Sequence, residues 1–360
     1  MTGESIKAGL QGNSMLRVIV TLMIGTAGAL LARLAGLPAA ALIGSTLAVS
    51  VVSFCRLPTS VPPWLRNMAF AAIGCSLGSG VNTDFLELAV KWPLSLSGLV
   101  LVMGSVLFAS SWVLTSFFGQ SRVTAILAAS PGALSYSLAI AATGVGDARA
   151  IIVIQSIRLL SITTGLPLIL DLLDLQHGSG GGNGQGSISL AATAGLFLLT
   201  LLFGFLLNNR RLPAAYLIAG VLVSGVLHYL GVVSGRPQSG FLWIGFVITG
   251  AVIGARFTTI PLADIKRLVG AALAVVVVSS GLAAFFAVLA AKILHLPFGQ
   301  LWVSYAPGGV EAMAAMALSL GYDSAFVATH HLFRIILLLF ILPVLLRLFR
   351  KTETKKSSSG

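Results

Sequence analysis

Two equally spaced sets of a Pro-Gly pair, an aspartate and an arginine are the residues of this sequence best suited to chemistry. The two sets are Pro131-Gly132, Asp147 and Arg158, and Pro307-Gly308, Asp323 and Arg334. In each set the aspartate follows the proline by 16 residues and the arginine follows the aspartate by 11. Eleven residues make about three helical turns, so the aspartate and the arginine share a helix face about 16 Å apart. Arginine presents a fork of donors suited to carboxylate or phosphate, which predicts a site for a small anion. The alternative is an ion pair between each arginine and a carboxylate elsewhere in the bundle.

The Pro-Gly pairs predict a break in each of two apolar helices. Proline removes a backbone hydrogen bond, and glycine lets the chain turn. A broken helix exposes backbone amide and carbonyl groups, and the N-terminus of its second half favours anions. An ordinary kinked helix is the alternative. We predict a cavity lined by Pro131, Gly132, Pro307, Gly308, Gly309 and Glu311.

The second set also carries groups that can titrate. Glu311 is the only acid within either interrupted segment, and Ser135 is its counterpart in the first copy. His330 and His331 stand where the first copy has Ile154 and Gln155. Histidine titrates near neutral pH, so these three residues are candidates for coupling solute movement to protons. The alternative for each histidine is a hydrogen-bonded packing residue.

Composition places all of these residues in a membrane. Of 360 residues, 57% are hydrophobic and 9% are charged, whereas about a quarter are charged in an ordinary soluble domain. Apolar runs of about 20 residues recur, enough to cross a hydrocarbon core, and such runs must be helical. The expected class is an all-α polytopic membrane protein. Its expected spans are 16–36, 38–55, 67–82, 94–116, 148–171, 189–207, 213–231, 241–257, 268–291 and 324–346, with interrupted segments at 123–144 and 299–320.

An internal duplication relates the two halves at an offset of 175 to 176 residues. The tetrapeptide at 37–40, Leu-Pro-Ala-Ala, recurs at 212–215, and Gly74 and Gly78 recur as Gly250 and Gly254. The expected domains are a first repeat at 1–177, a glycine-rich linker at 178–188, a second repeat at 189–347 and a basic tail at 348–360.

Charge predicts that the two repeats face opposite ways. The first repeat ends in Asp171 and Asp174, whereas basic residues follow the last span of the second. Because Lys and Arg collect on the cytoplasmic side, these ends lie on opposite faces. That requires an odd number of crossings, so each repeat has about five spans and one re-entrant segment. We expect a bacterial inner-membrane protein with cytoplasmic termini and a periplasmic linker, which is the plan of many secondary transporters.

These motifs together resemble the AbrB-duplication membrane protein family. The resemblance rests on Ser-Pro-Gly-Ala at 130–133, on Ala-Pro-Gly-Gly-Val-Glu-Ala-Met at 306–313, and on the aspartates and arginines that follow. It covers about residues 16–347. The family pattern tends toward Pro-Gly-Gly, so Ala133 is a departure that bears on the symmetry of the two breaks. The resemblance also implies two labels, ammonia monooxygenase and membrane regulator of gene expression.

The leading hypothesis is a secondary transporter of a small anionic solute. Its alternative is a membrane sensor or accessory protein that regulates gene expression indirectly. An enzyme is disfavoured, because only two of the five histidines are close in sequence and adjacent helical residues point about 100° apart, a poor chelate. No recognition motif for nucleic acid is present. We expect no cofactor or metal, with the lipid bilayer and the solute as partners and a homo-oligomer left open.

Overall fold

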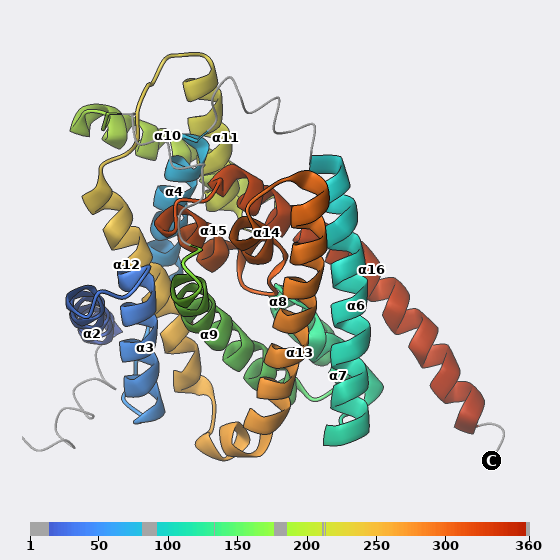
Figure 1. The fold of residues 1–360 in the computed structure, drawn as a ribbon. Helices are drawn as coiled ribbons and strands as arrows, with labels where there is room; N and C mark the ends of the chain where they lie inside the picture. Colours follow the sequence, from blue (N-terminus) through green and yellow to red (C-terminus); the bar gives the residue numbers. More distant parts are fainter. Residues whose placement is uncertain are drawn as a thin grey trace, which may run out of the picture.

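The computed structural model describes residues 14–80, 92–132, 134–175, 186–210, 212 and 214–357, and its elements there are helical (Figure 1). One isolated bridge, between Ser187 and Arg236, is the exception. Within these described ranges, seven helices are long and apolar enough to cross a membrane. The chain is therefore a multi-pass membrane protein, and the all-α class expected from sequence is confirmed.

Each half of the chain contains a similar succession of helices. The first half contains α2 (Ser14–Leu34), α3 (Ala40–Phe54), α4 (Pro63–Gly78), α6 (Trp92–Phe118), α7 (Arg122–Ala129), α8 (Leu134–Ala141) and α9 (Ala148–Leu172). The second contains α10 (Leu190–Asn209), α11 (Ala215–Tyr229), α12 (Ser239–Ala255), the 3₁₀ turn η1 (Arg256–Thr259), α13 (Leu262–Leu294), α14 (Phe298–Tyr305), α15 (Val310–Ser319) and α16 (Ser324–Ser357). Most of the predicted linker lies outside the described residues.

Three of the ten expected spans form helices that are shorter than a bilayer is thick. α3 and α11 have 15 residues each, and α4 has 16. At 1.5 Å per residue these helices reach about 24 Å, against a hydrocarbon core of about 30 Å. α3 and α11 start late because Ala39 and Ala214 are left-handed, with φ of 48° and 52°. α4 starts at Pro63, a favourable first helical residue.

The short helices connect the two halves through close backbone contacts. α4 packs against α11, and α3 packs against α12. A Cβ atom on Gly220 would lie 2.6 Å from the Cys75 backbone nitrogen, and one on Gly254 would lie 2.8 Å from the Ser50 nitrogen. Small residues let membrane helices approach this closely. The first half is therefore interlocked with the second at two helix pairs.

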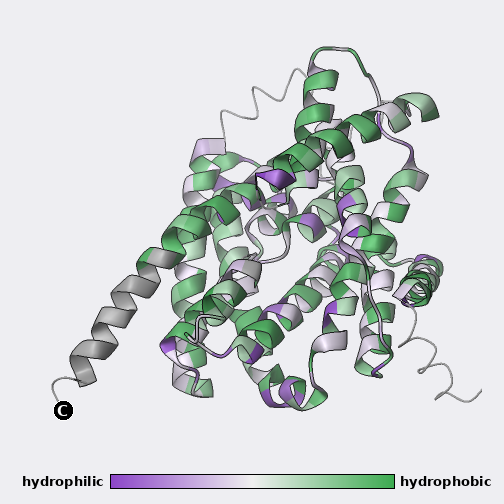
Figure 2. Cartoon of the chain, turned by 180° about the vertical axis from the view of Figure 1, so that it is seen from behind, coloured by the Kyte–Doolittle hydropathy of each residue, from purple (hydrophilic) through white to green (hydrophobic). Residues whose placement is uncertain are grey.

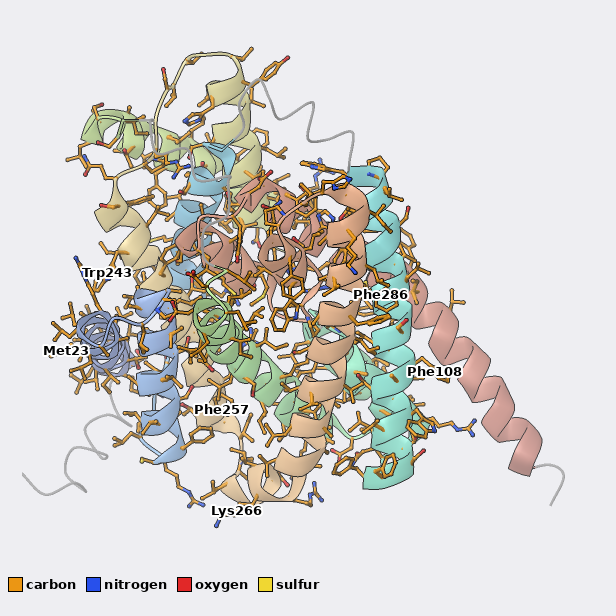
Figure 3. The ribbon with its side chains drawn as sticks, in the orientation of Figure 1. Met23, Phe108, Trp243, Phe257, Lys266 and Phe286 are labelled. Atoms are coloured by element: carbon orange, nitrogen blue, oxygen red, sulfur yellow. The ribbon has the colours of Figure 1, made fainter. Side chains whose placement is uncertain are left out.

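The periphery of the molecule is apolar, as lipid contact requires. Figure 2 shows hydrophobic residues along most of the helices. Met23 on α2 and Phe108 on α6 point away from the other helices (Figure 3) and are 66% and 78% exposed. α6 and α13 run side by side at one edge of the molecule (Figure 1). Exposed apolar side chains on the peripheral helices are expected of a protein that lies in a membrane.

Both interrupted segments are pairs of short helices rather than single long ones. α7 ends at Ala129 and α8 begins at Leu134, while α14 ends at Tyr305 and α15 begins at Val310. Figure 1 shows α14 and α15 in the middle of the molecule. The expected interruptions at the Pro-Gly pairs are therefore present, and their re-entrant path remains a prediction.

Candidate functional site

The helix breaks leave backbone carbonyl groups without their usual partners. The last four carbonyl groups of any helix have no intrahelical donor. Here the ends of α7 and α14 lie inside the protein, and Ser130 and Ala306 at these ends are buried. A buried side chain with several donors is therefore required at each break.

Arg158 supplies the donors for the first break. Its side chain reaches from α9 and is 2% exposed. Nη1 donates to the carbonyl oxygens of Ala128 at 3.2 Å and Ala129 at 2.9 Å, and Nη2 donates to that of Ser130 at 3.0 Å. A positive charge at the C-terminus of a helix also complements its dipole. Arg158 thus caps α7 from a neighbouring helix.

Arg334 serves the second break, with a different choice of carbonyl groups. It lies on α16 and is 1% exposed. Nη1 donates to the Ala306 oxygen at 2.6 Å, and Nη2 donates to the Gly308 oxygen at 2.5 Å, beyond the proline. Arg334 therefore binds carbonyl groups on both sides of Pro307, whereas Arg158 binds only carbonyl groups that precede Pro131.

The two arginines have no carboxylate partner in the described part of the chain. Ion pairs within 4.0 Å there involve Arg267, with Asp147 and Asp264. The Nε atoms of Arg158 and Arg334 are buried and have no hydrogen-bond partner. A buried donor left without a hydrogen bond costs about 1–3 kcal/mol. Each guanidinium thus uses its terminal nitrogens on the backbone and keeps its Nε–H group uncommitted.

Asp147 is the N-cap of α9. Its Oδ1 accepts hydrogen bonds from the backbone nitrogens of Arg149 at 2.9 Å and Ala150 at 3.2 Å. Its own backbone nitrogen donates to Thr124 Oγ1 on α7 at 2.9 Å. The aspartate therefore starts the helix that carries Arg158 and ties that start to the interrupted segment.

Asp323 has the same role at α16. Its Oδ1 accepts from the backbone nitrogens of Ala325 at 3.0 Å and Phe326 at 3.1 Å. Its own nitrogen donates to Gln300 Oε1 on α14 at 3.1 Å. Burial raises the pKa of the Asp323 carboxyl, and the two backbone hydrogen bonds oppose that rise.

The two adjacent histidines point in different directions and have different hydrogen-bond partners. His330 Nδ1 is 2.7 Å from the Phe326 carbonyl oxygen, so it donates there, and Nε2 accepts from Ser95 Oγ at 2.8 Å. His331 Nε2 donates to the Val303 oxygen at 2.9 Å. Gln155, its counterpart, donates to the Leu127 oxygen at 2.8 Å. Both His331 and Gln155 therefore support an interrupted segment, and His330 has the partners of a packing residue.

A cavity of about 450 Å³ lies where the two breaks come together. Its lining comes from both halves of the chain: Arg66, Asn67, Phe70, Gly132, Leu134, Tyr136, Gln155, Arg158, Leu159, Asn208, Leu212, Ala214, Ala215, Tyr216, Arg256, Pro307, Gly308, Gly309, Val310, Glu311, Ile335 and Leu339. A Cβ atom on Gly132 would lie 3.5 Å from Arg334 Nη2, so the first break rests against the arginine of the second half. The chain turns there with a φ of +82° at Gly132, which glycine adopts readily because it has no Cβ atom.

The cavity lining carries an excess of positive charge. Three arginines, Arg66, Arg158 and Arg256, face one carboxylate, Glu311. Glu311 acts electrostatically on both Arg256 and Arg334, and Arg158 also acts on Arg334. The carboxylate therefore lies within the field of arginines from two parts of the site.

The structure brings only some of the predicted residues to this cavity. Gly132, Arg158, Pro307, Gly308, Gly309 and Glu311 line it. The lining does not include the other predicted residues, which are Pro131, Asp147, Asp323, His330, His331 and Arg334. Arg334 nevertheless lies next to Gly132, which does line the cavity. Sequence reasoning missed Arg66 and Arg256 and named Gln155 only as the counterpart of His331. One signal for Arg256 was an arginine at the end of the expected span 241–257.

Metal chemistry has no visible ligand set in the described ranges, where no three His, Cys, Asp or Glu side chains gather in a way that holds a metal ion. The two cysteines there are free, with Cys55 exposed and Cys75 buried. Whether the chain is an enzyme is a separate matter, and the expectation that it is not one stays a prediction.

Comparison with known proteins decides the family. A family model described as "Transition state regulatory protein AbrB" matches residues 2–89 and 41–350. The chain belongs to the AbrB family. A Bacillus subtilis (strain 168) relative in this family, "Uncharacterized protein YhjN", is 25% identical over 96% of this chain and 98% of its own length. An Escherichia coli (strain K12) relative, "Putative regulator AbrB", is 23% identical over 89% of this chain and 93% of its own. The resemblance drawn from the sequence motifs is confirmed.

Proposed function

We propose that this AbrB-family protein is a secondary transporter of a small anionic solute, bound in the cavity between the two helix breaks. The observation that carries the proposal is the excess of arginine over carboxylate in an interior cavity to which both halves contribute. Two unit charges 4 Å apart at a protein surface interact by about 4 kcal/mol. An anion is therefore the ligand that such a cavity attracts most strongly.

Two further donors favour an anion at the deep end of the cavity. α15 begins at Gly309 without a side-chain cap, and Gly309 and Val310 line the cavity. A helix N-terminus offers free backbone N–H groups and the positive end of its dipole. Arg158 lines the cavity, and its buried Nε–H group is a second donor without a partner among the described residues. An anion that accepts from either donor removes a cost that the empty protein carries.

Architecture supports movement of the solute rather than static binding. The helices of the second half begin close to 176 residues after those of the first, as α14 at 298 and α7 at 122 illustrate. In our proposal the repeats are inverted in the bacterial inner membrane, with cytoplasmic termini and a periplasmic linker. Rocking of one helix bundle against another around the shared cavity then opens that cavity to alternate sides.

Flux measurements with a charge-removing variant test the proposal. Purified protein in proteoliposomes is assayed with labelled phosphate, acetate, succinate and aspartate. Arg256→Gln is the informative variant, because the Arg256 guanidinium lines the cavity and has no hydrogen-bond partner among the described residues. We expect at least a tenfold loss of flux for the transported anion. Arg149→Gln is the matched control, since Arg149 is exposed on the same helix as Arg158 and does not line the cavity. No flux of any of these anions, or equal flux in both variants, counts against transport.

A second candidate function is a membrane sensor or accessory protein that affects gene expression indirectly. The words "regulatory" and "regulator" in the names of the family model and the E. coli relative favour it. This function predicts that deleting the gene changes transcript levels while cellular solutes stay constant. The transport function predicts instead that cellular solutes change, and that this change precedes any change in transcripts. The ammonia monooxygenase label predicts bound metal, which elemental analysis of the purified protein detects.

A further inference from the structure

Glu311 is a carboxylate that the protein places in the cavity and leaves without a direct partner. Within the described residues it has no ion pair within 4.0 Å and no side-chain hydrogen bond. A Cβ atom on Gly309 would lie 3.4 Å from Glu311 Oε2, so the carboxylate bends back over the start of α15. Glu311 also lines the cavity. Its oxygens are therefore available to a ligand.

A helix-start role does not account for this position. A glutamate in the first turn complements the helix dipole, and Glu311 is in the first turn of α15. That role is met equally well by a glutamate that points out of the cavity. Inside it, the same charge repels the anion that the surrounding arginines attract. With a purely anionic ligand, the predicted proton coupling is the role left to this carboxylate, whereas a ligand with its own positive group gives it a direct partner.

The arginines around Glu311 fall into two groups. Arg158, 2% exposed, and Arg334, 1% exposed, form the deep group. Arg66 is exposed and Arg256 is partly buried, and these two act on each other electrostatically. Glu311 acts on a member of each group, on Arg334 in the first and on Arg256 in the second. One carboxylate therefore interacts with both groups of arginines.

We propose that the cavity takes an amino dicarboxylate, a solute with two carboxylates and one ammonium group. This inference rests on the proposed anion site and names the class of solute that fills it. One carboxylate binds Arg158, the other binds Arg66 and Arg256, and the ammonium group binds Glu311. The single net negative charge of such a solute leaves the arginine-rich lining less positive, and the ammonium removes the repulsion from Glu311. The cavity of about 450 Å³ is ample for a four- or five-carbon molecule.

Binding of a matched pair of ligands tests the proposal. Aspartate and succinate have the same four-carbon dicarboxylate skeleton, and only aspartate carries an amino group. Titration calorimetry on the full-length protein in lipid nanodiscs measures the dissociation constant of each. We expect aspartate to bind at least tenfold more tightly than succinate. In Glu311→Gln, which keeps the size of the side chain, we expect aspartate to bind at least tenfold more weakly and succinate to bind as well as before or better.

Two further variants separate this effect from a general loss of folding or charge. Glu311→Asp keeps a carboxylate on a shorter stem, so aspartate should still bind more tightly than succinate. Asp171→Asn removes an exposed charge from α9 outside the cavity and should leave both constants unchanged. A purely structural Glu311 changes the melting temperature of Glu311→Gln without changing the ratio of the two dissociation constants. That outcome overturns the proposal.

The remaining outcomes distinguish this inference from the proposed function. If Glu311→Gln strengthens both ligands equally, Glu311 is a repelling counter-ion, and the solute is a simple anion. The inference then fails and the anion site stands. If neither ligand binds the unaltered protein, the amino dicarboxylate class is excluded. The anion site itself fails only when no anion is transported or when Arg256→Gln and Arg149→Gln behave alike in the flux assay.

Discussion

Arg158 and Arg334 do structural work with their terminal nitrogens while each keeps a buried N–H group uncommitted. Before the structure, the choice was between solute binding and an ion pair with a carboxylate. The described residues show a third arrangement, in which carbonyl groups freed by a helix break accept from the guanidinium. Five such hydrogen bonds join the two side chains to their breaks. One residue can therefore stabilise the break and still offer a donor to a ligand.

At this scale we predict that Arg158→Gln destabilises the protein by about 2–5 kcal/mol. The variant removes the donors to three carbonyl groups at the end of α7 and leaves those groups buried. Arg158→Lys keeps the charge but lacks the planar fork, so its loss should be intermediate. Thermal or denaturant unfolding in detergent measures the difference. Arg149→Gln is the control, and equal unfolding of Arg149→Gln and Arg158→Gln would show that the caps contribute nothing.

At the scale of helices, the packing of α4 on α11 depends on the absence of side chains. Gly74 and Gly220 face each other there, and a Cβ atom on Gly220 would lie 2.7 Å from the Gly74 Cα. The neighbouring atoms are backbone atoms, which cannot move aside as a flexible side chain does. The same close approach joins α3 to α12. The short helices thus form a rigid connection between the halves, around which the longer helices are arranged.

We predict that Gly220→Ala destabilises the protein by about 1–3 kcal/mol, because overpacking forces the helix pair apart. Gly195→Ala in α10 is the matched control, since nothing lies within 4 Å of its Cβ position. There alanine replaces glycine in an open part of a helix and should be neutral or stabilising by up to about 1 kcal/mol. Unfolding of both variants in the same detergent checks the prediction. A Gly220→Ala protein as stable as Gly195→Ala would mean that the α4–α11 contact is looser than it looks.

Helix ends show where sequence reasoning stops. The interruptions were predictable because proline and glycine announce a break locally. The lengths of α3 and α11 were not, because they depend on Ala39 and Ala214 in a left-handed conformation that alanine rarely adopts. The partners of Arg158 were hidden for a related reason. Backbone carbonyl groups have no residue type, so a sequence pattern cannot name them.

At the scale of the whole molecule, the cavity joins residues that are far apart in the chain. Arg66 and Arg256 come from α4 and η1, and Glu311 comes from α15. Sequence spacing placed Arg158 and Glu311 near the site because both follow the motif. It did not place Arg256, since only the packing of the two halves brings that residue to the cavity. The motif was thus predictable, and the assembly of the cavity was not.

The inverted arrangement predicts that the linker and the C-terminus lie on opposite sides of the membrane. In intact cells, a reporter inserted at residues 178–186 should be labelled from outside the membrane, and a reporter after Lys356 should not. The physical reason is the contrast between Asp171 and Asp174 at the end of the first half and the basic residues that follow the last apolar span. A third reporter after Gly119 is a control for the cytoplasmic side. Labelling of the linker and the C-terminus from the same side would exclude an odd number of crossings per repeat.

The carbonyl partners of the two arginines have an electrical consequence. Carbonyl oxygens carry partial charges, so they hold a guanidinium in place without cancelling its unit charge. Arg334 lies within the apolar span Ser324–Leu342 and Arg158 lies within Ala148–Leu172. Moving one elementary charge through a potential of 100 mV takes about 2.3 kcal/mol. Any shift of α9 or α16 along the membrane normal therefore does work against the membrane voltage, and an anion bound beside Arg158 reduces that work by travelling with it.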